Sequence, residues 1–148
     1  MPSILAGFLI AAAVAAKQPI SIQPYIDELR AAVKADDLPR FDEALERARV
    51  AIETMPVGKE RNLFRRAIQT AADIGKIWHF AATDPEGSYY DDERLPEFYD
   101  HMKRDYPTYR RFIADYTVMN HDGRVLYPTR ETRAFLLKQL ENTRRTSA

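Results

Sequence analysis

Two consecutive segments between Leu38 and Ala82 constrain the fold more than any other part of the chain. Their apolar residues recur every three or four positions, which is the pattern of one buried face per helix. These residues are Leu38, Phe41, Leu45, Ala48, Ile52 and Met55 in the first segment, and Phe64, Ala67, Ala71, Ile74, Trp78 and Ala81 in the second. Only Pro56, Val57 and Gly58 interrupt the two patterns, a short stretch of poor helix formers. We therefore expect an antiparallel helix pair at the centre of the fold.

Shorter segments with the same periodicity flank this pair. One precedes it at residues 22–33, and others follow at residues 95–102, 109–116 and 134–140. Residues 117–127 differ, because apolar and β-branched residues lie on both sides of a turn that ends in Gly123. That pattern predicts a short β-hairpin or an extended connection. The fold class is therefore mostly α, with five or six helices around the central helix hairpin.

The chain has 148 residues, which suits one domain, and we assign residues 17–148 to a single helical domain. Residues 1–16 carry no charged side chain and contain the apolar run Ile4–Ala16. A spanning helix needs about 20 apolar residues, whereas a secretory signal needs a shorter run that ends in small residues, as at Ala13 to Ala15. The run therefore predicts a signal peptide and an exported or periplasmic protein. The alternatives are a short N-terminal anchor in a membrane-associated protein, and a buried N-terminal helix.

Composition restricts the chemistry that the chain can support. The absence of cysteine excludes disulfides, thiolate metal sites and a cysteine nucleophile. Equal numbers of basic and acidic residues, 22 of each, argue against a nucleic-acid partner. No two of the three histidines have the spacing that places metal ligands on one helix face, and no serine lies in a Gly-x-Ser-x-Gly motif. We predict no cofactor and no metal, and the sequence favours a non-catalytic protein without deciding the question.

Residues 84–93 form an acidic stretch that contains two tyrosines. Turn-forming Pro85 and Gly87 predict a surface loop, where no helical period buries the side chains. Tyrosine combines a large apolar ring with a hydroxyl group, a combination that suits a partner interface. The candidate contacts in this loop are Tyr89, Tyr90, Asp91 and Asp92.

A second group of candidates is aromatic or imidazole-bearing. Its members are Trp78, His79, Tyr99, His101 and Tyr116. These residues either belong to the core and a partner surface or line a pocket. The first interpretation predicts a helical interaction module or accessory subunit of an exported or membrane-associated assembly, with a protein partner. The alternative is a small-ligand-binding protein or an enzyme whose pocket these five residues line.

Overall fold

The computed structural model describes residues 20–83, 94–116, 118–119 and 125–147, which form six helices and two very short strands. The chain is mostly helical, as its periodicity predicts. The helices belong to two compact units. Unit 1 comprises residues up to Ala72 and those from Gln139 onward, and unit 2 comprises residues Asp73 to Lys138. Helices α4 (Lys59–Thr83) and α7 (Thr129–Ser147) each contribute to both units.

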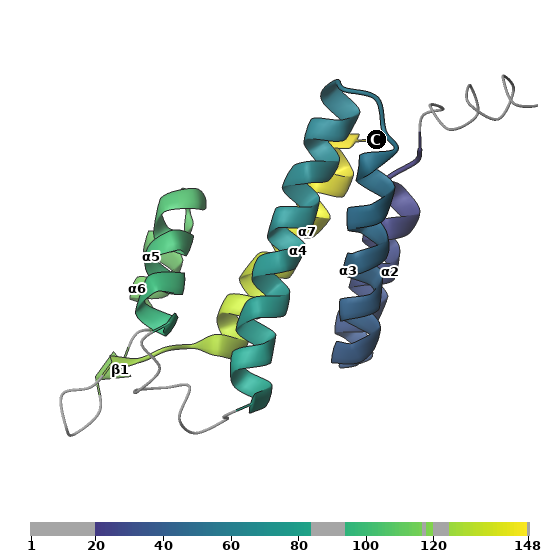
Figure 1. Ribbon diagram of the computed structural model, residues 1–148. Coiled ribbons are helices and arrows are strands. Elements are labelled where there is room, and N and C mark those ends of the chain that lie inside the picture. The colour runs from purple at the N-terminus through teal and green to yellow at the C-terminus, as the bar shows by residue number, and fades with distance from the viewer. Residues whose placement is uncertain (1–19, 84–93, 117, 120–124, 148) are drawn as a thin grey trace, which may run out of the picture. The chain divides into compact units, whose positions relative to one another are not determined.

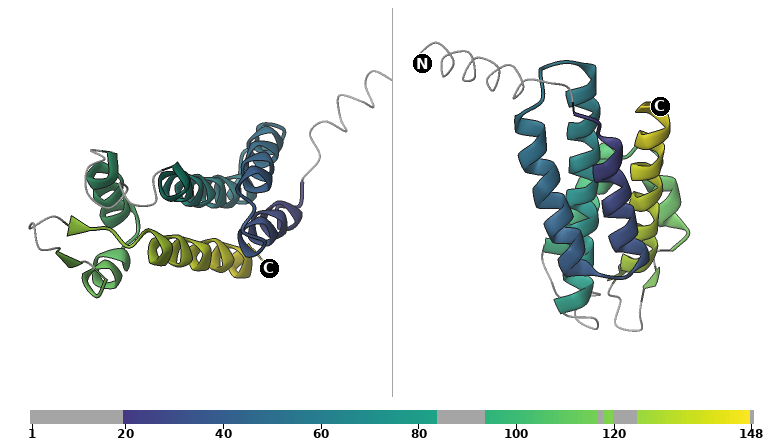
Figure 2. Two further views of the ribbon diagram at one scale, coloured as in Figure 1. Left: turned by 90° about the horizontal axis from the view of Figure 1, so that it is seen from below. Right: turned by 90° about the vertical axis from the view of Figure 1, so that its right-hand side faces the viewer.

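Unit 1 is built on α2 (Gln23–Lys34) and α3 (Leu38–Glu53), which run antiparallel and side by side (Figures 1 and 2). Within the same unit, the first half of α4 returns alongside α3 (Figure 1). The inward-facing positions have almost no exposed surface, and they include Ile26, Leu29, Phe41, Ala48 and Phe64. Burying a large apolar side chain stabilises a fold by about 1.5–3 kcal/mol, so these contacts hold the unit together.

The turn between α2 and α3 explains why the two helices lie antiparallel. Asp36 adopts a left-handed backbone conformation with φ 53°, which aspartate tolerates better than most residues. The N–H of Asp37 then donates to the carbonyl oxygen of Ala32 at 3.0 Å, which ends α2. Oδ1 of Asp37 accepts from the backbone N–H of Arg40 at 3.0 Å and caps α3.

Unit 2 contains the second half of α4, the shorter helices α5 (Arg94–Asp105) and α6 (Tyr109–Ala114), and the first half of α7. One face of α5 is buried, and its residues are Leu95, Phe98, Tyr99 and Met102. Strands β1 (Val118–Met119) and β2 (Val125–Leu126) pair antiparallel, with Val118 opposite Leu126 and Met119 opposite Val125. This pairing lies within residues 117–127, where the sequence predicts a hairpin or an extended connection.

The structure corrects the prediction for Tyr116, which the helical period places on a buried face. The period places it on one face with Tyr109 and Ile113, but its side chain is 43% exposed whereas those two are buried. The physical reason is that α6 ends at Ala114, so Tyr116 lies beyond the last helical residue and leaves the buried face.

Candidate functional site

The predicted contact residues fall into two groups in the structure. Tyr89, Tyr90, Asp91 and Asp92 lie outside the described residues. Trp78, His79, Tyr99 and His101 lie in unit 2, on α4 and α5.

Trp78 and His79 are neighbours on α4 but have different surroundings. Trp78 is buried, and the guanidinium carbon of Arg133 lies 4.6 Å from the centre of its ring, a cation–π distance. His79 is exposed. Successive residues of a helix point about 100° apart, because one turn takes 3.6 residues, so adjacent side chains seldom share an environment.

Tyr99 belongs to a buried cluster of hydroxyl groups. Its ring stacks on Tyr127 with centroids 4.4 Å apart, and its hydroxyl lies 3.4 Å from Oγ1 of Thr132. The hydroxyl of Tyr109 lies 2.8 Å from the same Oγ1 atom. Burial raises the pKa of Tyr99 and of Tyr109, and it also raises the pKa of the less buried Tyr127. These groups remain neutral and join α5, α6 and α7.

His101 connects α5 to α4 through a carboxylate. Its Nε2 lies 3.0 Å and 3.1 Å from the two oxygens of Asp73, and its Nδ1 lies 3.1 Å from Oδ2 of Asp105. The hydroxyl of Tyr106 donates to Oδ2 of Asp73 at 2.7 Å. The two ring nitrogens of His101 therefore each face a carboxylate, one on α4 and one on α5 itself. The network therefore fixes the position of α5 on α4.

Three of these four residues contact different partners. Trp78 contacts Arg133, Tyr99 contacts Thr132 and Tyr127, and His101 contacts Asp73 and Asp105. A single ligand pocket lined by them stays a prediction. Within the part of the chain that the structure describes, no group of three or more histidine, aspartate and glutamate side chains is arranged to hold a metal ion.

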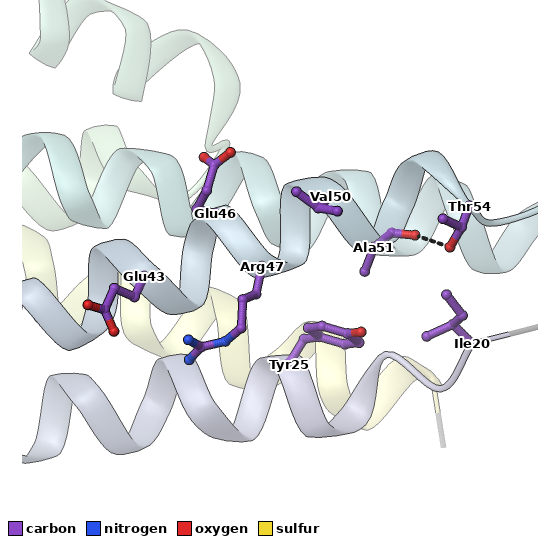
Figure 3. Close-up of a pocket in the computed structure, with 8 residues that line it drawn as sticks. All are labelled: Ile20, Tyr25, Glu43, Glu46, Arg47, Val50, Ala51 and Thr54. Atoms are coloured by element: carbon purple, nitrogen blue, oxygen red, sulfur yellow. Dashed lines mark hydrogen bonds between the residues drawn. The ribbon is translucent and has the colours of Figure 1, made fainter.

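A different site lies in unit 1, where α2 and α3 form an open groove of about 640 Å³ (Figure 3). We call it the α2–α3 groove, and its lining residues are Ile20, Tyr25, Glu43, Glu46, Arg47, Val50, Ala51 and Thr54. Figure 3 shows Ile20 and Thr54 at one end and Glu43 at the other. Most of the exposed lining surface is apolar, and Val50 is 61% exposed. Such a surface is suited to binding another apolar group.

Charges are distributed unevenly along the α2–α3 groove. Glu43 and Glu46 form no hydrogen bond or ion pair with any described residue, whereas Arg47 lies 3.9 Å from Glu28. Glu28 is itself bound to Arg40 at 2.9 Å, and this hydrogen bond lowers the pKa of Glu28 and raises that of Arg40. The cations near the groove are therefore already paired across α2 and α3. Its acidic end has two carboxylates without a partner in the described chain.

Sequence reasoning missed the α2–α3 groove. The one sign of it in the sequence is Val50, an apolar residue on the otherwise polar face of α3, which follows Arg49 and precedes the buried Ala51. A single exposed valine is common on soluble proteins and predicts nothing alone. The groove is formed only when Tyr25 of α2, and Ile20 from the segment before that helix, lie beside α3 (Figure 3).

The comparisons with known proteins assign no family to this chain. Protein-family models, curated protein sequences and solved structures give no match. None of the described helices is both long and apolar enough to cross a membrane, and residues 1–16 lie outside that set. The function must therefore be argued from the geometry of the chain itself.

Proposed function

We propose that the protein is a non-catalytic helical interaction module, an accessory subunit of an exported or membrane-associated assembly, which binds a partner protein through the α2–α3 groove. The observation that carries the proposal is the combination of exposed apolar walls, including Val50, with the carboxylates of Glu43 and Glu46. Leaving apolar surface in water is unfavourable, and a docked partner removes that surface from water.

The shape of the groove favours a helix as the docked segment. Helix α3 and its C-cap Thr54 line the groove from Glu43 onward, over a length of about 16 Å at 1.5 Å per residue. That length corresponds to about three turns of a partner helix, whose apolar stripe would lie against Tyr25 and Val50. Because the acidic end holds Glu43 and Glu46, the partner helix should carry lysine or arginine at that end.

The apolar run of the chain itself fits this charge pattern poorly. Residues 1–16 contain no charged side chain, so the run offers no cationic side chain to the acidic end of the groove. We therefore assign the groove to a partner protein.

Two designed peptides test this assignment. Both are fluorescein-labelled, three-turn helices with a leucine stripe; one ends in two lysines and the other carries two glutamates at the same positions. We expect the lysine peptide to bind the full chain about three- to tenfold more tightly at low salt, since exposed ion pairs contribute about 0.2–1 kcal/mol each. The measurement is fluorescence anisotropy as a function of protein concentration.

Matched variants separate the groove from general electrostatic attraction. The double variant Glu43→Gln/Glu46→Gln should remove the preference for the lysine peptide, and Val50→Asp should weaken the binding of both peptides. The control Glu97→Gln/Asp115→Asn removes two exposed carboxylates from unit 2 and should keep the preference. Absence of binding by both peptides, or a preference that survives Glu43→Gln/Glu46→Gln, would contradict the proposal.

A further inference from the structure

A second cavity lies in unit 1, between α3 and the first half of α4, and has a volume of about 310 Å³. We call it the arginine cavity. Its polar walls are formed by Arg49, Glu53, Arg61, Arg65 and Gln69, and its apolar walls by Ile52 and Ile68. None of these residues lines the α2–α3 groove, so the two sites can be tested independently.

Helical spacing explains why these side chains converge. Arg61, Arg65 and Ile68 follow one another at four and three residues along α4, which places them on one face. On α3, Arg49 and Ile52 are three residues apart and face the same cavity. Two antiparallel helices thus bring three arginine residues to the walls of one cavity.

The positive charges in the cavity are only partly compensated. The one carboxylate among its lining residues is that of Glu53, whose Oε2 lies 3.6 Å from Nη2 of Arg61. Arg49 forms no hydrogen bond or ion pair within the described part of the chain. Among the described residues, Arg65 forms one hydrogen bond, of 3.3 Å from its Nη1 to Oδ1 of Asn62, which is a neutral acceptor. Two of the three arginines therefore have no anionic partner in the described residues.

Arg61 provides an independent sign of a missing acceptor. Its Nη1 donates to the carbonyl oxygen of Met55 at 3.3 Å, but its Nε is buried and has no hydrogen-bond partner among the described residues. Buried donors are almost always satisfied, so an unsatisfied one calls for an explanation, and a bound water or ion is one such explanation. The donor belongs to a residue that lines the cavity.

We propose that the arginine cavity is a binding site for a phosphate group, held by Arg49, Arg61 and Arg65. Guanidinium groups bind phosphate through paired, charge-assisted hydrogen bonds. A phosphate monoester has three terminal oxygens and nearly two negative charges, which matches three arginines better than the two oxygens of a carboxylate. Ile52 and Ile68 form an apolar wall that the apolar part of a phosphorylated molecule can contact.

Arginine side-chain NMR on the full chain tests the site directly. The Nε–Hε signals are followed while inorganic phosphate, phosphoserine or acetate is added at constant ionic strength and pH. We expect phosphate to shift the Arg61 signal in a saturable way, and acetate to bind at least about fivefold more weakly. Tighter binding of phosphoserine than of phosphate would assign the site to an organic phosphate, and equal binding would assign it to the free ion.

Two cavity variants and one control complete the experiment. Arg49→Gln and Arg65→Gln replace exposed side chains, so the fold should persist, and each should weaken phosphate binding at least about fivefold. Arg66→Gln removes the same charge from the adjacent position of α4, which does not line the cavity, and should leave binding unchanged. The proposal is wrong if acetate binds as tightly as phosphate, if the Arg61 shift does not saturate, or if the cavity variants and the control weaken binding equally.

Discussion

At the scale of single residues, the buried hydroxyl groups of Tyr99 and Tyr109 make the free energy of unfolding depend on pH in the alkaline range. Burial raises the pKa of both groups in the folded protein, whereas an unfolded tyrosine loses its proton near pH 10. Below about pH 10 both hydroxyl groups keep their protons in the folded and in the unfolded chain, so their full contribution to the free energy of unfolding is present there. Above it the unfolded state binds fewer protons, and each tyrosine lowers the free energy of unfolding by about 1.4 kcal/mol per pH unit.

The variant Tyr109→Phe tests this dependence. At neutral pH it should cost about 0.5–1.5 kcal/mol, because Thr132 loses the shorter of its two hydrogen bonds to tyrosine, at 2.8 Å, and keeps the one to Tyr99 at 3.4 Å. Above about pH 10 the free energy of unfolding should fall less steeply with pH in the variant than in the unmodified chain, because the variant has one ionising tyrosine fewer. Urea unfolding at a series of pH values measures both quantities. Tyr116→Phe, at a side chain that is 43% exposed, is the matched control. Parallel pH curves for the unmodified chain and Tyr109→Phe would refute the explanation.

At the scale of elements, Asp73 fixes α5 on α4. It accepts from His101 and from Tyr106, and its side chain is only 13% exposed. Asp73→Ala leaves both donors without this acceptor and should lower the free energy of unfolding by about 1–3 kcal/mol. Amide hydrogen exchange should accelerate in α5 more than in α2, which lies in unit 1.

The exposed Asp115 supplies the matched control for this prediction. Asp115→Ala removes the same carboxylate from the end of α6 and should change stability by less than about 0.5 kcal/mol. If Asp73→Ala accelerates exchange in α2 and α5 equally, the network does not act on α5 specifically.

The same elements show what the sequence could predict. Periodicity identifies the buried faces of α3 and α5 correctly, because the position of a residue within its own helix determines the face on which its side chain lies. Tyr116 is misplaced because the period does not indicate that α6 stops at Ala114. The contact between His101 and Asp73 joins residues that are 28 positions apart, and no local pattern encodes such a pair. The α2–α3 groove and the arginine cavity likewise require two helices to be side by side.

At the scale of the whole molecule, the two proposed binding sites and the two polar networks occupy different units. The α2–α3 groove and the arginine cavity are formed by residues of unit 1, whereas the Tyr99 and His101 networks lie in unit 2. Unit 1 also includes the end of α7, which Glu141 joins to Arg30 of α2 at 3.1 Å. We therefore expect substitutions in the unit 2 networks to affect stability, and those in the unit 1 sites to affect binding.

The export that we propose can be tested on the full chain by intact mass. If residues 1–16 are a secretory signal, expression in a bacterium with a working Sec pathway should yield a periplasmic protein that lacks residues up to about Ala15 or Ala16. Leu9→Arg places a charge in the apolar run and should leave a full-length protein in the cytoplasm, whereas Leu9→Ile should be exported normally. An intact chain in the membrane fraction would instead favour the anchor. Cleavage would place the new N-terminus within a few residues of Ile20, which lines the α2–α3 groove. In the exported protein, the groove residue Ile20 would therefore be close in sequence to a free N-terminus.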